Sequence, residues 1–359
     1  TLEEAWRAIE PHTIILLLGM MILNVFLDLS GFFEMMVKRV LHAAEHPFRL
    51  LLGLAVLSGV LSALFLNDTT CLMLTPPLVM LLKRSKLPPA PFLLTLAMSS
   101  NVGSVVSLTG NPQNMLIGSY SGLSYPAFAA GLWPVAAIGC VLLVVVLVLA
   151  FPGEFLRSAP LVALRPAPVR CHRPLALKST AVLAALVIAF FAGVAPAEAA
   201  LLGGAFLLLT RRVKPQKLYR EIDWSLLVMF AGLFVVVAGL ERTLLTPERI
   251  ATVGALGLQQ PWRLATLTAA LSNLVSNVPA VLVLKPFVES LADREHAWLI
   301  VAMASTLAGN LTLPGSVANL IVAQRARSLG VELGFGVYLC IGVPVTLLTI
   351  AAGTALLAR

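Results

Sequence analysis

Apolar stretches long enough to cross a bilayer follow one another along nearly the whole chain of 359 residues. A transmembrane α-helix needs about 20 consecutive apolar residues. Short groups of polar and helix-breaking residues interrupt some of these stretches at their centres, as at 66–70 and 109–114. This pattern predicts an all-α polytopic membrane protein in which several helices break inside the membrane.

The chain contains two copies of one unit. Residues 61–77 (LSALFLNDTTCLMLTPP) match residues 271–286 (LSNLVSNVPAVLVLKP) at an offset of 210, and residues 107–117 match 312–321 at an offset of 205. Ordered internal similarity of this kind indicates a tandem duplication. The alignments pair Asn67 with Asn277, Gly110 with Gly315, and Asn114 with Asn319.

Each copy predicts the same series of segments: a helix, an apolar stretch with a polar break at its centre, a helix interrupted by Gly, Asn and Pro, and a final helix. The centrally broken stretch can form two spanning helices or one re-entrant hairpin, and its recurrence in both copies favours hairpins. The segments are 12–36, 49–82, 91–119 and 124–151 in the first copy, and 223–243, 262–288, 297–325 and 331–357 in the second.

The second copy also has a helix pair, 177–195 and 197–210, that the first copy lacks. Because TLEEAWRAIEP (1–11) resembles the end of the connection that follows this pair (217–223), we expect the natural protein to begin with two more helices. An asymmetric duplication is the alternative. The expected organisation is a first transmembrane repeat at 1–152 without its initial helix pair, a basic cytoplasmic linker at 153–176, and a second repeat at 177–359.

The positive charges indicate how the segments are oriented. If 12–36 runs inward and each hairpin returns to its own side, 18 of the 25 Lys and Arg residues fall in or beside inner loops, whereas the outer loop 118–126 carries no charge. Such an excess marks the cytoplasmic side. Segment 223–243 then runs outward, so the repeats have inverted topology, as in many secondary transporters. We expect a multi-pass protein of the cell (cytoplasmic or inner) membrane, with cytoplasmic loops at 38–49, 83–90, 152–176, 211–222 and 325–330.

Composition excludes several classes of protein. Only 12% of the residues are charged and 59% are hydrophobic, whereas about a quarter of a soluble domain is charged, so a soluble enzyme is excluded. The net charge of +8 is explained by the inner loops, and no basic run alternates with aromatic residues as in nucleic-acid-binding proteins. The four cysteines form no CxxC or Cys/His pair, and no Ser/His/Asp set lies at membrane depth. We therefore expect no enzyme activity and no cofactor.

The helix breaks are the predicted binding sites. Backbone groups exposed by a break are tolerated in the membrane only where they line a protein cavity, and inverted-repeat transporters bind substrate and ions there. Amide and hydroxyl oxygens suit Na⁺, and the N-termini of half-helices suit an anion. The candidate residues are Asn67, Asp68, Thr69, Ser100, Asn101, Thr109, Gly110, Asn111, Asn114, Ser276, Asn277, Gly315, Ser316 and Asn319, of which Asn67, Asp68, Gly110, Asn277 and Gly315 are candidates for Na⁺.

Asp68 is the candidate for the coupling carboxylate. A carboxylate at membrane depth is costly and marks an ion or proton path by default. The alternative is that Asp68 caps the helix that starts at Thr69.

The sequences around these breaks resemble those of a known family. FLNDTTCLMLTPPLVM (65–80), SNVGSVVSLTGNPQNMLIGS (100–119) and LSNLVSNVPAVLVLKP (271–286) resemble the ion transporter superfamily, and are closest to its arsenite permease and NhaD-like anion permease branch. The resemblance implies two hairpins, two interrupted helices, a homodimer, elevator-like alternating access, and coupling to Na⁺ or H⁺. An aspartate at the first hairpin tip resembles the arsenite permease pattern.

We therefore expect a secondary active transporter that moves a small anion, either an inorganic oxyanion or a carboxylate, coupled to Na⁺ or H⁺. Two alternatives are open. The first is a Na⁺/H⁺ antiporter without an anion substrate, in which Asp68 exchanges the two cations. The second is an arsenite or antimonite efflux permease, for which the basic inner loops could dock a soluble ATPase. The expected surroundings are the lipid bilayer, and no nucleic acid is expected to bind.

Overall fold

The computed structural model describes residues 1–156, 171–209, 213, 215–243 and 257–358. These residues form α-helices and one 3₁₀-helix, and they contain no β-strand. Residues 157–170 of the predicted linker 153–176, and 211, 212 and 214 of the predicted loop 211–222, lie outside the described part of the chain. The all-α prediction is confirmed.

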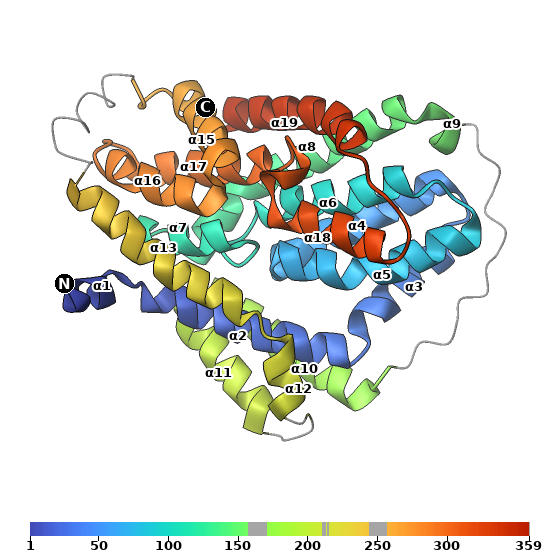
Figure 1. Cartoon of the computed structure of the whole chain (residues 1–359), viewed down its shortest axis with the longest axis horizontal. Helices are drawn as coiled ribbons and strands as arrows, with labels where there is room; N and C mark the ends of the chain where they lie inside the picture. Colours follow the sequence, from blue (N-terminus) through green and yellow to red (C-terminus); the bar gives the residue numbers. More distant parts are fainter. Residues whose placement is uncertain (157–170, 210–212, 214, 244–256, 359) are drawn as a thin grey trace.

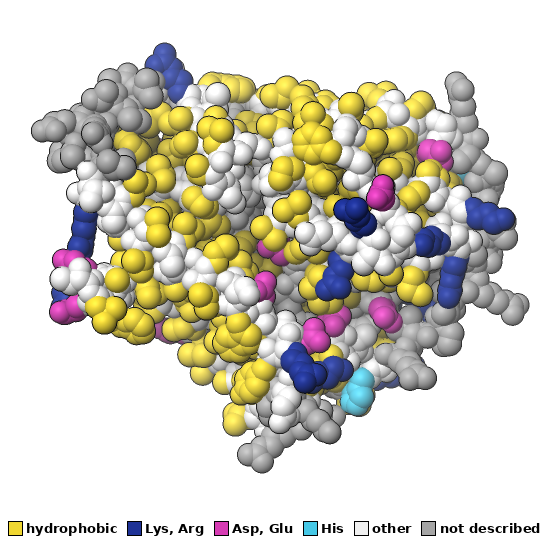
Figure 2. Space-filling view, in the orientation of Figure 1, with side chains coloured by type: hydrophobic (Ala, Val, Ile, Leu, Met, Phe, Trp, Pro, Cys, Tyr) yellow, Lys and Arg dark blue, Asp and Glu magenta, His cyan; other side chains and the backbone are white. Residues whose placement is uncertain are grey.

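Within the described part of the chain, five helices are long and apolar enough to cross a membrane: α2 (Pro11–Leu29), α4 (Pro47–Leu64), α8 (Tyr125–Ala150), α10 (Arg173–Phe191) and α19 (Phe335–Leu357). Hydrophobic side chains cover much of the face shown in Figure 2, while most of the Lys and Arg side chains drawn lie in its right half. Extended apolar surface of this kind is unusual on a soluble monomer. It suits a protein whose surroundings are lipid.

The first repeat contains the predicted hairpin and interrupted helix. α4 ends at Leu64 and α5 (Asn67–Ser85) begins after a break at Phe65 and Leu66, with both residues in extended or irregular conformations. α6 (Pro89–Ser104) is separated from α7 (Pro112–Ser121) by seven residues. α4 packs closely on α6, where a Cβ atom on Gly103 would overlap the backbone of Gly59.

The second repeat has the same two devices. α15 (Pro261–Val275) and α16 (Asn277–Glu289) form the hairpin, with a break at the single residue Ser276. α17 (Arg294–Ala308) is followed by the short 3₁₀-helix η1 (Leu313–Gly315) and by α18 (Val317–Ser328). The prediction of one hairpin and one interrupted helix per repeat is thus confirmed.

The predicted C-terminal boundary of the helix 12–36 was wrong. α2 stops at Leu29, and Gly31, with a φ of 77°, turns the chain into a second helix, α3 (Phe32–Ala43). Glycine adopts a positive φ without steric cost, which makes it a common helix terminator. α3 then packs on α4 and α5.

The remaining helices assemble into a separate body with α2. In Figure 1, α2, α10, α11 (Pro196–Leu209), α12 (Pro215–Glu221) and α13 (Trp224–Thr243) lie below, with the short α1 (Leu2–Ala8) at one end. We call these helices the α2 body. The closest packing within it is between α2 and α11, where a Cβ atom on Gly19 would lie 2.6 Å from the backbone of Ala200.

The hairpins and interrupted helices form the second body. α4–α8 and α15–α19 lie above the α2 body in Figure 1, with the short α9 (Pro152–Phe155) at one end. We call them the hairpin body. Helices from both repeats pack together within it, notably α18 on α5 and α19 on α8. All four predicted breaks therefore belong to one body.

Candidate functional site

A network of buried asparagines joins the breaks at the centre of the hairpin body. Its hub is Asn101 on α6, which is only 2% exposed. Asn67 Nδ2 donates to Asn101 Oδ1 over 2.8 Å, which ties the first hairpin tip to the first interrupted helix. Asn101 Nδ2 in turn donates to Asn310 Oδ1 (2.8 Å) and Asn319 Oδ1 (3.1 Å) in the second repeat. The hub thus connects the first hairpin tip and the first interrupted helix with the second interruption.

Each interruption is closed by an asparagine in the same way. Asn114 Nδ2 donates to the carbonyl groups of Ser104 (3.1 Å) and Ser107 (3.0 Å). Asn319 Nδ2 donates to those of Gly309 (2.7 Å) and Thr312 (3.3 Å). The residues of the second set lie 205 positions after those of the first. A break leaves carbonyl groups without helical partners, and these two amides satisfy them.

The two repeats also exchange one equivalent hydrogen bond each. Asn111 Nδ2 donates to Thr306 Oγ1 over 3.2 Å, and Ser316 Oγ donates to Asn101 Oδ1 over 3.1 Å. The offset of 205 pairs Asn111 with Ser316 and Asn101 with Thr306. The contacts therefore follow a pseudo-twofold relation, as the duplication predicts.

The first interruption is tightly packed around Gly110. Asn67 N donates to Gly110 O over 2.9 Å, so the hairpin tip rests directly on the interruption. A Cβ atom on Gly110 would overlap the carbonyl of Ser104 and would lie 2.9 Å from that of Ser62. Nearby, the hydroxyl groups of Thr109 and Tyr125 are 3.0 Å apart. This position has room only for glycine.

The second hairpin tip is more open than the first. Ser276 is exposed and has φ 77° and ψ 159°, a conformation that is costly for any residue except glycine. Asn277 is half-buried, and its Oδ1 accepts a hydrogen bond from Ser272 Oγ over 2.6 Å. Among the described residues, no hydrogen bond joins Asn277 to Gly315 or to the hub. The structure thus places Ser276, Asn277 and Gly315 beside the network and outside it.

Asp68 lies at the first tip with its carboxylate unpaired. It is half-buried in the first turn of α5, and within the described chain its carboxylate has no hydrogen bond and no ion pair. The interpretation of Asp68 as a helix cap is wrong, because the N-cap of α5 is Leu66. Thr69 follows it, also half-buried. An acidic residue in a first turn interacts favourably with the helix dipole, but it remains available for a ligand.

Ser100 stands next to the hub through a different contact. Cys71 Sγ lies 3.0 Å from Ser100 Oγ, which itself donates to Ala97 O over 2.7 Å. Both residues are buried. Ser100 therefore makes a second contact between α6 and α5, one helical turn after Asn67 along α5.

Sequence reasoning missed three members of the network: Asn310, Thr306 and Gln113. Gln113 Nε2 donates to Thr306 Oγ1 over 3.3 Å, and Asn310 Nδ2 donates to Met98 O over 3.2 Å. Thr306 could have been found, because the 205-residue offset pairs it with Asn101. The repeat alignment could not have pointed to Asn310, since the same offset pairs it with the apolar Val105.

The network is uncharged. None of its hydrogen bonds, as described above, involves Lys or Arg. No group of three or more His, Cys, Asp and Glu side chains that could hold a metal ion occurs in the described part of the chain. The arrangement therefore offers amide and hydroxyl groups, helix N-termini and one unpaired carboxylate, which suits reversible binding of small solutes and ions.

Known proteins share this architecture. The family model described as Citrate transporter (CitMHS) matches residues 1–308 and 250–358, which together span nearly the whole chain. The 46 kDa membrane protein of Mycobacterium leprae is 30% identical over 363 residues, which cover 96% of this chain and 85% of that protein. The silicon efflux transporter LSI3 of Oryza sativa subsp. japonica is 28% identical over 434 residues, which cover 99% and 88%.

A solved structure has the same fold. The crystal structure of the Alcanivorax borkumensis YdaH transporter superposes with a TM-score of 0.63 at 17% identity, covering 96% of this chain and 84% of that one. These matches confirm the resemblance drawn from the sequence. The chain belongs to the citrate transporter family, and it is a membrane transporter and not an enzyme.

Proposed function

We propose that the protein is a secondary active transporter that carries a small anion, either an inorganic oxyanion or a carboxylate, together with Na⁺ or H⁺. The observation that carries this proposal is the asparagine network around Asn101, which joins breaks of both repeats inside one body. Inverted-repeat transporters build their substrate and ion sites from unwound backbone and half-helix ends at such a place.

The half-helices supply groups that bind an anion. α5, α7, α16 and α18 all begin at a break. The first turn of a helix has N–H groups without an intrahelical acceptor, and the helix dipole adds positive potential there. Since no Lys or Arg side chain takes part in the described hydrogen bonds of the network, the helix N-termini and the side-chain amide and hydroxyl groups are what the network offers to an anion.

Asp68 supplies the coupling step of the proposal. Binding of Na⁺ or a proton stabilises a half-buried carboxylate that has no partner. Its position one residue after Asn67 puts it beside the network but not in it. Cation binding at the tip and anion binding at the breaks would then stabilise each other by charge attraction across a short distance.

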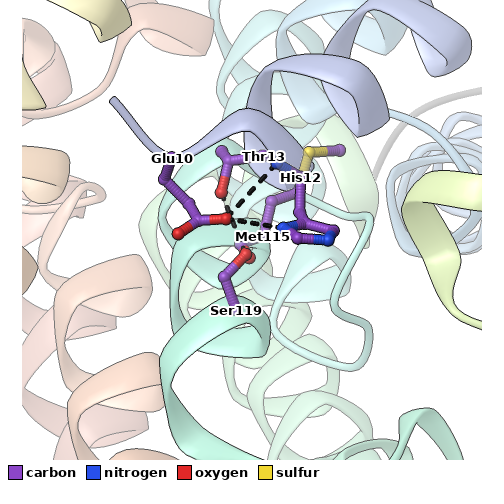
Figure 3. Close-up of polar contacts among 5 residues, drawn as sticks. All are labelled: Glu10, His12, Thr13, Met115 and Ser119. Carbon is purple, nitrogen blue, oxygen red and sulfur yellow. Dashed lines mark hydrogen bonds and ion pairs between the residues drawn. The ribbon is translucent and has the colours of Figure 1, made fainter. Parts of the chain in front are cut away.

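We expect the transport movement to be a displacement of the hairpin body relative to the α2 body. α2 touches the hairpin body through α7, where the hydroxyl groups of Thr13 and Ser119 are 3.0 Å apart (Figure 3). Beside this contact Glu10 accepts from the backbone and ring nitrogens of His12. In elevator-like alternating access, the hairpin body slides along a scaffold formed by the α2 body, and this contact breaks. We place the basic loops, such as 83–90 and 325–330, on the cytoplasmic side by the positive-inside rule, and a homodimer contact on the scaffold.

The first test is the thermal stability of the purified protein against Na⁺, Li⁺, pH and a panel of small anions and neutral oxyacids. Any ligand of the folded state raises the apparent melting temperature by mass action. The panel includes citrate, which the family description names, and silicic acid, because a rice relative is a silicon efflux transporter. Sulfate, phosphate, dicarboxylates and arsenite complete it.

Three outcomes separate the candidates. Stabilisation by an anion that depends on Na⁺ or on acidic pH supports the proposed cotransport. Stabilisation by Na⁺ alone, with no anion adding to it and with loss of the effect in Asp68→Asn, would replace the proposal by a Na⁺/H⁺ antiporter. Stabilisation by arsenite, independent of any cation, would favour an efflux permease.

A further inference from the structure

We infer that Lys285 and Arg325 are a pair of cationic side chains that flank the anion site, one on each route between the breaks and the surface. The inference rests on the proposed function and names the residues that attract a charged solute toward a site whose own groups are neutral. It comes from a register that the duplication repeats in four half-helices.

The half-helices lead away from the breaks in two pairs. α7 packs on α16, and α18 packs on α5. In Figure 1, α7 and α16 lie to the left of α5 and α18. Each pair combines a hairpin arm of one repeat with the second half of the interrupted helix of the other. In the orientation proposed above, α7 and α16 form the outer route, and α5 and α18 form the inner route.

The two basic residues have the same position in their helices. Lys285 is the ninth residue of α16, and Arg325 is the ninth residue of α18. The offsets of 210 and 205 pair them with Thr75 and Tyr120, the ninth residues of α5 and α7. With a rise of 1.5 Å per residue, this position lies about 12 Å along the helix from the break. Each route therefore has one basic residue at this level.

Lys285 holds an uncompensated charge between α16 and α7. It is half-buried, and its Nζ lies 4.2 Å from the centre of the Tyr120 ring. It forms no ion pair with any residue that the structure describes. A cation–π contact fixes an ammonium group without supplying a negative charge. Since α7 and α16 contain no other Lys or Arg, Lys285 is the source of positive side-chain charge on the outer route.

Arg325 is the corresponding residue of the inner route. Its side chain is exposed, and within the described ranges it too lacks an ion pair. Val317, the first residue of α18, is 50% exposed, so α18 is accessible both at the break and at Arg325. Arg327 differs, because its Nε lies 3.8 Å from a carboxylate oxygen of Glu332. The charge of Arg325 is thus the free one on this helix.

The distance from the breaks explains what the two cations can do. A Lys or Arg in direct contact with the anion would also oppose its release. At about 12 Å the Coulomb attraction is weaker but still acts, and it grows in proportion to the charge of the solute. The neutral amides and hydroxyls of the network then make the direct contacts. The pair therefore favours charged solutes over neutral ones without trapping them.

The first measurement compares ligands of different charge on the purified full chain. Affinities for sulfate, citrate and the uncharged silicic acid are obtained from thermal-stability titrations. We expect Lys285→Gln and Arg325→Gln each to weaken the binding of doubly charged sulfate about tenfold, and that of citrate by more. Binding of silicic acid should not change. Lys285→Arg and the control Arg327→Gln/Glu332→Gln, which removes both members of an ion pair, should bind anions as the wild type does.

The second measurement uses charged thiol reagents and does not depend on which solute is carried. Val317→Cys is made in a protein whose four native cysteines have been replaced. Its rates of reaction with a negatively and a positively charged methanethiosulfonate are compared at low ionic strength, where screening is weak. Arg325→Gln should lower the ratio of the two rates about threefold, because it removes a positive charge about 12 Å away. Arg327→Gln/Glu332→Gln should leave this ratio unchanged.

The outcomes separate this inference from the proposed function. Wild-type anion affinity in Lys285→Gln and Arg325→Gln, or an unchanged rate ratio with Arg325→Gln, would overturn the inference and leave the proposed function intact. Equal weakening of sulfate and silicic acid would overturn it as well, since that result shows a loss of structure and not of charge. A wild-type protein that binds neither sulfate nor citrate would count against the proposed function, and the rate ratio would then decide the inference alone.

Discussion

At the scale of single residues, side-chain amides hold the centre of this protein together. Asn101 makes hydrogen bonds with four other side chains, Asn67, Asn310, Ser316 and Asn319, in an environment closed to water. A buried polar network is stabilising only when its members are satisfied, and loss of one partner leaves the others unpaired. Asn101 is therefore the residue whose loss should do the greatest damage.

We expect Asn101→Ala to lower the stability of the protein by about 1–3 kcal/mol, because it leaves the amide of Asn67 and the hydroxyl of Ser316 without their buried partner. With an unfolding entropy of about 2.1 cal/mol/K per residue, that corresponds in a chain of 359 residues to a fall in melting temperature of about 1–2 °C for each kcal/mol. Transport should be lost as well. An unchanged melting temperature would show that the hub does not hold the breaks together.

Asn24 on α2 provides the matched control. Like Asn101 it is 2% exposed, but neither its Nδ2 nor its Oδ1 has a hydrogen-bond partner. Replacing an unsatisfied buried polar group by an apolar group of similar shape is neutral or stabilising. Asn24→Leu should thus leave the melting temperature unchanged or raise it. A clear fall would contradict the assignment of Asn24 as a buried amide that contributes nothing to stability.

At the scale of helices, the sites are defined by where helices stop. Two asparagines, Asn114 and Asn319, close the two interruptions by equivalent bonds to backbone carbonyls. Glycine allows the first hairpin tip to approach its interruption, since Asn67 N reaches Gly110 O at 2.9 Å. Close backbone packing at the breaks therefore matters as much as the side-chain hydrogen bonds.

Gly110→Ala tests this close approach. The added methyl group would overlap the carbonyl of Ser104, and we expect transport to fall at least tenfold, with a lower melting temperature, because closely packed backbone cannot relax away from it. Gly232→Ala on α13 is the control: nothing lies within 4 Å of its Cβ position, so the variant should behave as wild type. Equal behaviour of the two variants would contradict the packing argument.

Most of these elements could be predicted from the sequence, because the duplication marks each break twice. The pairing of Asn67 with Asn277 and of Gly110 with Gly315 located both hairpin tips and both interruptions. The end of α2 was missed, since Gly31 stands inside an apolar stretch that continues beyond it. Asn310 was missed because its position at the hub depends on the packing of α17 against α6, which no local pattern reports.

The difference between the two hairpin tips could not be foreseen either. The duplication predicts equivalent backbone at the two tips, yet Leu66 is buried while its counterpart, Ser276, is exposed in a strained conformation. A pseudo-symmetric duplication folds into two different local environments when each repeat meets different neighbours. Such asymmetry is what the proposed alternating access would require, since the site would open toward one side at a time.

At the scale of the whole molecule, the two bodies meet where α2 contacts α7, α10 contacts α8 and α13 contacts α16. Thr13 of the α2 body and Ser119 of the hairpin body lie side by side in Figure 3, and their hydroxyl groups are 3.0 Å apart. If the bodies slide past each other during transport, a covalent bond at this point must stop the cycle. The spacing is compatible with a disulfide.

The double variant Thr13→Cys/Ser119→Cys tests this movement. We expect oxidation to abolish transport and a reductant to restore it, while either single variant transports normally under both conditions. The four native cysteines, Cys71, Cys140, Cys171 and Cys340, are first replaced in all the proteins compared. Full transport by the oxidised double variant, with the cross-link verified, would show that the two bodies do not separate here.

The most direct test of the central claim is uptake into proteoliposomes under an imposed cation gradient. The wild-type protein is reconstituted with the anion that stabilises it, and uptake is measured with an inward Na⁺ or H⁺ gradient and without one. We predict that the gradient drives accumulation of the anion above its outside concentration, and that Asp68→Asn abolishes this accumulation. Accumulation that is equal with and without the gradient, or that survives in Asp68→Asn, would contradict it.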